Sequence, residues 1–199
     1  MWRATPRQQR SRDRVATILA VTSRLLVECG FDALNTRQIA AAAGLPPSLL
    51  YHYFPNKGAI VKALAQRRVV PLRRELTGLL SEVKIGLWRE ALRRLVTKMV
   101  RTYRREPAAG AIMEALQSDP DLKRFNHEMN DEFAQMFVRF FRAAGAEIHP
   151  SGLLRIARLV IVVFDAVVPD LVAASPQEAQ KIAGEVSTLL VGYLGAYLR

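Results

Sequence analysis

Residues 47–54 carry side chains whose types and spacing best fit a binding surface in this 199-residue chain. Leu50 and Phe54 are four residues apart, so on a helix they share one face, which we expect to be buried. Ser48 and the aromatic residues at 51–53 then lie on the outward surface. Exposing aromatic rings is unfavourable unless something covers them. The helix therefore indicates contact with a partner.

A second short helix precedes this one, and a tight turn joins the two. Asn35 and Gln38 have the spacing of a capping box for a helix that begins at residue 36. Gly44 supplies the left-handed backbone that a sharp turn needs. Each helix is under three turns long, so both require support from the helix predicted over 12–29. The pattern predicts a helix-turn-helix, whose second helix enters the DNA major groove. An ordinary helical hairpin within an all-α core is the alternative.

The rest of the chain also has helical periodicity. Apolar residues recur at spacings of three and four, and no sustained two-residue alternation indicates a strand. We therefore predict an all-α fold, with Pro71 kinking or splitting the helix that begins near Asn56. Cys29 lies on the apolar stripe of the first helix and is expected to be buried. Further helices are predicted over 87–105, 107–117, 120–145, 151–174 and 176–198.

Composition narrows the class of protein. The formal net charge is +11, with 29 Lys and Arg against 18 Asp and Glu. Residues 58–105 carry thirteen of the basic residues against three acidic ones, which predicts that a polyanion would bind the N-terminal part. A solvated helix face is the alternative interpretation of this charge run. A basic helix lying on an anionic membrane or scaffold is the alternative.

Several other classes are not expected. One cysteine and three histidines argue against a disulfide framework or a metal site, and we expect no cofactor. No nucleophile elbow or phosphate-binding loop points to an enzyme. No apolar run approaches the roughly 20 residues of a membrane span, and no targeting signal is evident. We expect a cytoplasmic protein.

Two stretches resemble a known family. Residues 30–45, GFDALNTRQIAAAAGL, and residues 50–57, LYHYFPNK, are similar to the two halves of the TetR family signature. The resemblance covers residues 12–64. It implies a three-helix DNA-binding domain over 1–58 and a helical ligand-binding and dimerisation domain over 59–199. The implied function is a dimeric repressor released from a palindromic operator by a small apolar or amphipathic molecule; an activator is the alternative within the family.

The resemblance also implies which residues contact double-stranded DNA. The first short helix would contribute a phosphate contact and a phosphate or guanine contact, the recognition helix would read bases, and the flanking positions would hold phosphates. These residues are Thr36, Arg37, Pro47, Ser48, Leu49, Tyr51, Tyr53 and Lys57. Tyr51 packed under the recognition helix is the alternative for that residue. Pro46 stands where the family often has a capping serine. The arginines at 3, 7, 10, 12 and 14 either follow the DNA or form a solvated tail.

A palindromic operator implies a homodimer, because two recognition helices must lie about one DNA turn apart. The last two helices suit this role. The last one has an apolar stripe and several glycines, which favour close packing against a second copy, and the helix over 151–174 is apolar on nearly all sides. The predicted interface residues are Ile182, Val186, Leu189, Leu190, Tyr193, Leu194 and Tyr197. A monomeric core is the alternative reading of the stripe.

The small-molecule effector is expected among the helices between 87 and 174. Candidate lining residues combine apolar and polar character: Met99, Tyr103, Met113, Phe133, Phe137, Phe164 and Asp165. Met and Phe at helical spacing also fit an ordinary core. Asp165 is different, because a carboxylate in an apolar run must be paired, hydrogen-bonded or next to a wet cavity. Arg155 or Arg158 of a second copy is an alternative partner for it.

Overall fold

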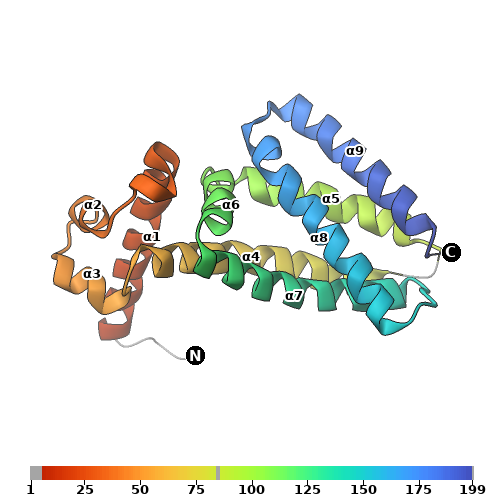
Figure 1. The fold of residues 1–199 in the computed structure, drawn as a ribbon, viewed down its shortest axis with the longest axis horizontal. Helices are drawn as coiled ribbons and strands as arrows, with labels where there is room; N and C mark the ends of the chain where they lie inside the picture. Colours follow the sequence, from red (N-terminus) through yellow and green to blue (C-terminus); the bar gives the residue numbers. More distant parts are fainter. Residues whose placement is uncertain (1–5, 84–85, 199) are drawn as a thin grey trace.

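The computed structural model describes residues 6–83 and 86–198, and every regular element in those ranges is an α-helix. At one end lie α1 (Pro6–Ala33), α2 (Thr36–Ala42) and α3 (Pro47–Tyr53), and α4 (Lys57–Glu82) runs from there along the molecule (Figure 1). The other elements are α5 (Trp88–Arg104), α6 (Ala109–Ser118), α7 (Pro120–Ala143), α8 (Pro150–Ala173) and α9 (Pro176–Gly195). The predicted all-α fold is confirmed. Within the described ranges, no helix has the length and apolar character to cross a membrane.

Local signals set most helix ends. Asn35 accepts a hydrogen bond from the Gln38 amide while the Gln38 side chain accepts one from the Asn35 amide, which completes the predicted capping box. Asp119 and Ser175 accept hydrogen bonds in the first turns of α7 and α9, and each is followed by a proline at the first helical position. Gly30 interrupts α1 with φ 72° and ψ 174°, a backbone that favours glycine.

Of the two forms predicted for the fourth helix, a kink or a split at Pro71, the split is absent, because α4 continues through the proline from Lys57 to Glu82 with its ring exposed to solvent. The expectation for Cys29 is wrong. Cys29 is exposed and not buried, and its thiol donates to the Leu25 carbonyl oxygen at 3.1 Å. The buried part of the apolar stripe on α1 therefore ends before Cys29.

The N-terminal helices share one core with the first half of α4 and with α6. Ile18, Leu26, Ile39, Leu50 and Ile60 are all fully or almost fully buried in it. Because the same cluster includes Ile112 and Leu116 of α6, packing is continuous across residue 58. The sequence boundary between the two predicted domains therefore stays a prediction.

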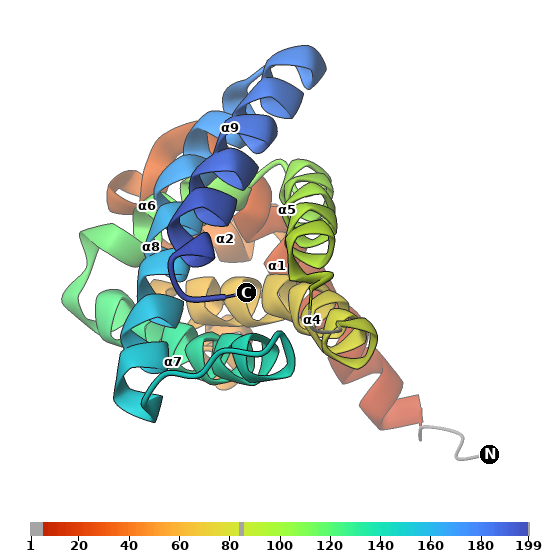
Figure 2. The same cartoon turned by 90° about the vertical axis from the view of Figure 1, so that its right-hand side faces the viewer.

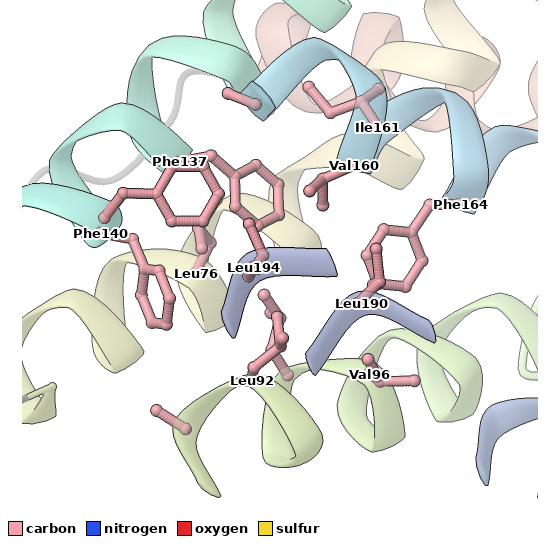
Figure 3. Close-up of a cluster of buried hydrophobic side chains, with 14 of the residues drawn as sticks. Leu76, Leu92, Val96, Phe137, Phe140, Val160, Ile161, Phe164, Leu190 and Leu194 are labelled. Atoms are coloured by element: carbon pink, nitrogen blue, oxygen red, sulfur yellow. The ribbon is translucent and has the colours of Figure 1, made fainter. Parts of the chain in front are cut away.

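A second core fills the helical bundle at the other end. Viewed from that end, α9 lies on the outside of the bundle, against α5 and α8 (Figure 2). Figure 3 shows Leu190 and Leu194 of α9 directed into a cluster that includes Leu92, Phe137 and Phe164. Val186 is buried there as well.

This packing corrects part of the predicted dimer interface. The side chains of Val186, Leu190 and Leu194 belong to the core of their own protomer, because this face of α9 covers α5 and α8. Ile182 and Tyr193 are half-buried beside them. Of the seven predicted interface residues, only Leu189 and Tyr197 are exposed, at 55% and 40%.

Candidate nucleic-acid interface and internal cavity

The turn between α2 and α3 has the geometry of a helix-turn-helix. Gly44 has φ 65°, and the Leu45 amide donates to the Ala40 carbonyl oxygen at 2.9 Å. Leu50 is fully buried, so it anchors α3 on the core formed with α1 and α2. Pro46 gives α3 no side-chain cap, as its cyclic side chain requires.

The outward face of α3 carries the residues that the sequence predicted for base reading. Pro47 and Ser48 are exposed, while Leu49 is half-buried. Tyr51 is 51% exposed, which is a large value for an aromatic side chain. Its hydroxyl lies 2.9 Å from the hydroxyl of Thr36, at the start of α2. Tyr51 therefore does not pack beneath the helix; it bridges α3 to α2 at the exposed surface.

Tyr53 lies on the opposite side of α3 and faces α1. Hydrogen bonds from Ser11 and Arg14 lower the pKa of its phenol, because both stabilise the phenolate oxygen. The ring is half-buried, and it meets the ring of His52 edge to face at 5.3 Å. Tyr53 thus orients α3 on α1, with a hydroxyl next to a cationic side chain.

Lys57 begins α4 and already has partners within the protein. Its ammonium donates to the carbonyl oxygens of Phe31 at 2.7 Å and Asp32 at 3.1 Å, and it lies 4.4 Å from the centre of the Phe31 ring. These contacts satisfy carbonyl groups just beyond the Gly30 interruption. Since an ammonium has three donors, one remains for a phosphate.

Exposed arginines flank this surface. Arg37 on α2 and Arg10, Arg12 and Arg14 on α1 are all exposed. Arg3 lies outside the described residues. Guanidinium groups attract the DNA backbone and can bind phosphates with two hydrogen bonds. The arrangement brings together the predicted contacts of α2, α3 and α4 on one end of the molecule, and their individual roles toward DNA remain predictions.

A second feature is a small cavity of about 40 Å³ within the bundle. Six of the seven predicted effector residues line it: Met99, Tyr103, Phe133, Phe137, Phe164 and Asp165. The seventh, Met113, lines an open cleft of about 850 Å³ between α6, α7 and α8. Four residues line both spaces: Asn126, Asn130, Ile161 and Asp165.

Asp165 is one of the four residues that line both spaces. Burial raises the pKa of its carboxyl, and hydrogen bonds from Asn130 and Asn126 together with the charge of Arg68 oppose the rise. The Asn130 side-chain amide donates to Asp165 Oδ2 at 2.8 Å. Arg158, one of its two alternative partners, instead bonds Asp131 at 2.9 Å.

Arg68 is a charged residue of the cavity that was not predicted from the sequence. Only 8% of its surface is exposed, and its guanidinium lies 5.0 Å from the ring of Tyr103. A usable signal was present, because Arg68 stands four residues from both Leu64 and Leu72 on the buried face of α4. A cation at such a position cannot be an ordinary solvated side chain.

The fold and these two sites define a class of protein: an all-helical protein with an N-terminal helix-turn-helix and a helical C-terminal body that contains a cavity. Comparison with known proteins identifies the family. Residues 18–64 match "Bacterial regulatory proteins, tetR family", and residues 88–194 match "Tetracyclin repressor-like, C-terminal domain". The chain belongs to the TetR family of bacterial transcriptional regulators.

Individual relatives agree with this assignment. The HTH-type transcriptional regulator EthR of Mycolicibacterium smegmatis is 32% identical over 127 residues, which are 61% of this chain and 58% of that protein. A TetR-family regulator from Streptomyces coelicolor is 28% identical, with a TM-score of 0.63 over 93% of this chain and 99% of its own. A TetR-family structure from Syntrophomonas wolfei shares the fold at 15% identity, with a TM-score of 0.75 over 91% and 96% of the two chains.

Proposed function

We propose that the protein is a dimeric, cytoplasmic transcriptional repressor that binds a palindromic operator in double-stranded DNA and is released by a small apolar or amphipathic effector. The single observation that carries the DNA-binding part is the exposed face of α3. It presents Ser48 and Tyr51 to solvent on a helix that Leu50, Tyr53 and the Thr36 hydroxyl hold in a fixed orientation. A rigid support of this kind favours specific contact with base edges.

Exposed apolar side chains on and near α8 and α9 support dimerisation. Leu159 and Val162 of α8 are 46% and 60% exposed. Leu189 of α9 is 55% exposed, and Tyr197, two residues beyond the last residue of α9, is 40% exposed. A Cβ added at Gly184 or Gly192 would meet nothing within 4 Å, so the protomer itself does not require glycine there. Close approach of a second copy explains both features.

Helix α4 supports a mechanical link between effector and DNA. Its first residue, Lys57, donates to the carbonyl oxygens of Phe31 and Asp32 at the C-terminal end of α1. Further along α4, Arg68, Val69 and Leu72 line the small cavity. A molecule that enlarges the cavity must displace α4 or its neighbours. Displacement of α4 changes the spacing of the two recognition helices in a dimer, which must stay near ~34–36 Å.

Selection from a random duplex pool tests the proposal. The protein should enrich an inverted repeat, and it should prefer that repeat over a scrambled duplex by at least about 10³-fold at physiological salt. A metabolite screen for release of the selected duplex should then identify the effector. Binding that depends on salt but not on sequence, together with equal binding to anionic vesicles, would instead favour the membrane or scaffold function.

A further inference from the structure

The buried side chain of Arg68 decides which ligand groups the small cavity is able to bind. Nη1 donates to the Ala109 carbonyl oxygen at 3.1 Å, and Nη2 lies 3.0 Å from the sulfur of Met113. Nε is buried and has no hydrogen-bond partner among the described residues. No carboxylate of the described chain lies within 4.0 Å of the guanidinium. The buried cation thus has neutral partners only.

Burying an unpaired charge is strongly unfavourable, and a guanidinium cannot relieve this by losing its proton. Asp165 is the acidic residue that shares the cavity, and burial raises the pKa of its carboxyl. The Asn130 amide donates to one of its oxygens at the border with the open cleft. No ion pair within the protein therefore compensates the buried guanidinium of Arg68.

We propose that the effector carries an anionic head group, a carboxylate in the simplest case, which binds Arg68 inside the small cavity while its apolar tail extends into the open cleft. This rests on the proposed effector-released function and names its ligand class. The small cavity accommodates a group of a few non-hydrogen atoms, whereas the cleft has the volume of a small-molecule site.

Further residues fit this arrangement. The Arg68 guanidinium lies over the Tyr103 ring, which leaves the guanidinium edge for hydrogen bonds. The groups facing Asp165 are Arg68 from α4 and Asn126, His127 and Asn130 from α7. Ile161, Val162 and Pro169 of α8 give the cleft an apolar wall for the tail.

Head-group selectivity provides the test. Octanoate, octan-1-ol and octylamine have matched tails, and their dissociation constants are measured by calorimetry on the full-length protein without DNA. Octanoate should bind at least about 10-fold more tightly than the alcohol, because charge-assisted hydrogen bonds add to affinity. The amine should bind more weakly still. If the three probes bind equally, if the amine binds best, or if octanoate shows no binding up to millimolar concentration, the proposal is wrong.

Three substitutions at two positions distinguish the role of Arg68 from that of Asp165. Arg68→Met should remove the preference for octanoate over octan-1-ol, while Arg68→Lys should retain part of it. Asp165→Asn should keep or increase octanoate affinity, because it removes a competing negative charge. A loss of octanoate binding in Asp165→Asn with retention in Arg68→Met would assign the head group to Asp165 and overturn the proposal. The wild-type probe series decides the matter even if a variant fails to fold.

Release of the selected duplex by octanoate tests the anion site and the proposed repressor function separately. Octanoate that binds the free protein but leaves the selected duplex bound supports the anion site and contradicts effector release. Equal binding of the three probes by a protein that releases its duplex with some other molecule contradicts the anion site and leaves the repressor function intact.

Discussion

The hydroxyl oxygens of Thr36 and Tyr51 lie 2.9 Å apart, which joins the first turn of α2 to the exposed side of α3. Either hydroxyl is able to donate to the other, and the one that accepts keeps its own proton for a further partner. Two residues predicted as separate DNA contacts therefore form a unit. The pair leaves one hydroxyl proton free at a position fixed by both helices, and we expect this proton to face bound DNA.

This unit predicts non-additive substitutions. Thr36→Val and Tyr51→Phe should each weaken operator binding, and the double variant should lose no more affinity than the worse single one, because either change removes the same bridge. The cost to folding should stay below about 1 kcal/mol, since the bond is exposed. Fluorescence anisotropy with the selected duplex measures the DNA affinities of the wild type, the two single variants and the double variant, which together form a double-mutant cycle.

Tyr53→Phe is the matched control for that cycle. Its hydroxyl contacts Ser11 and Arg14 on α1, away from Thr36. The combination of Tyr53→Phe with Thr36→Val should therefore be additive. Additive losses in both double variants would show that Thr36 and Tyr51 act independently.

Substitutions of Lys57 and Ser48 should weaken DNA binding in different ways. Lys57→Ala removes a phosphate contact, so all duplexes should bind more weakly and the salt slope should fall by about 1. It also removes two hydrogen bonds to carbonyl groups, so we expect a loss of about 1–2 kcal/mol in the free energy of unfolding. Ser48→Ala should relax the preference at one base pair per half-site without changing the salt slope.

Lys62→Ala is the control for charge alone. Lys62 lies on the same helix and faces Phe125 at 5.7 Å from the ring centre. It should change neither the salt slope nor the base preference. If Lys57→Ala leaves the salt slope unchanged while stability falls, Lys57 has a purely structural role.

The corrected surface of α9 gives a test of dimerisation. Leu189→Glu places a charge on the exposed face and should produce a folded monomer in sedimentation velocity, with operator affinity reduced at least about 10-fold. Leu190→Glu, one residue further, should unfold the bundle because Leu190 is 1% exposed. Gln135→Glu on the exposed side of α7 adds the same charge and should remain dimeric. A dimeric Leu189→Glu would place the interface elsewhere.

Residues that act locally were predictable, whereas those that depend on packing were not. The capping box of Asn35 and Gln38 and the left-handed Gly44 follow from short-range chemistry, and the structure has both. The stripe on α9 is apolar on two sides, so periodicity alone could not tell that Leu190 faces its own core while Leu189 faces outward. Arg68 was missed because a charged residue within a basic segment resembles a solvated one until the neighbouring helices are placed.

Asp165 predicts a pH dependence of stability. Burial raises the pKa of its carboxyl in the folded protein, so the folded state binds more protons than the unfolded state above the ordinary value of 3.8. Its contribution to stability is therefore present at low pH and is lost as the pH rises through the raised pKa. Asp165→Asn should stabilise the protein at neutral pH and flatten this part of the curve, as measured by urea unfolding from pH 4 to 8. A variant less stable than wild type at pH 7 would show that the ionised carboxylate is favourably paired.

Pro71 predicts how α4 transmits the effector signal. The proline lies inside a continuous helix, three residues beyond Arg68 and one before the cavity residue Leu72. A proline removes one amide donor, so the carbonyl of Arg67 lacks its usual helical partner and α4 bends most easily beside the cavity. Pro71→Ala restores the donor and should raise the free energy of unfolding by about 1–3 kcal/mol. The same change makes bending of α4 more costly, so a given effector should weaken operator binding by a smaller factor than the roughly 5–150-fold typical of such coupling.

Val70→Ala, one residue away at a position 56% exposed, is the control: it keeps the helix and should alter neither the stability nor the coupling factor. Anisotropy titrations with and without the effector found in the metabolite screen give the factor for each variant. An undiminished factor in a stabilised Pro71→Ala protein would mean that the signal reaches α3 by movement of α6 against α1, and not by bending of α4.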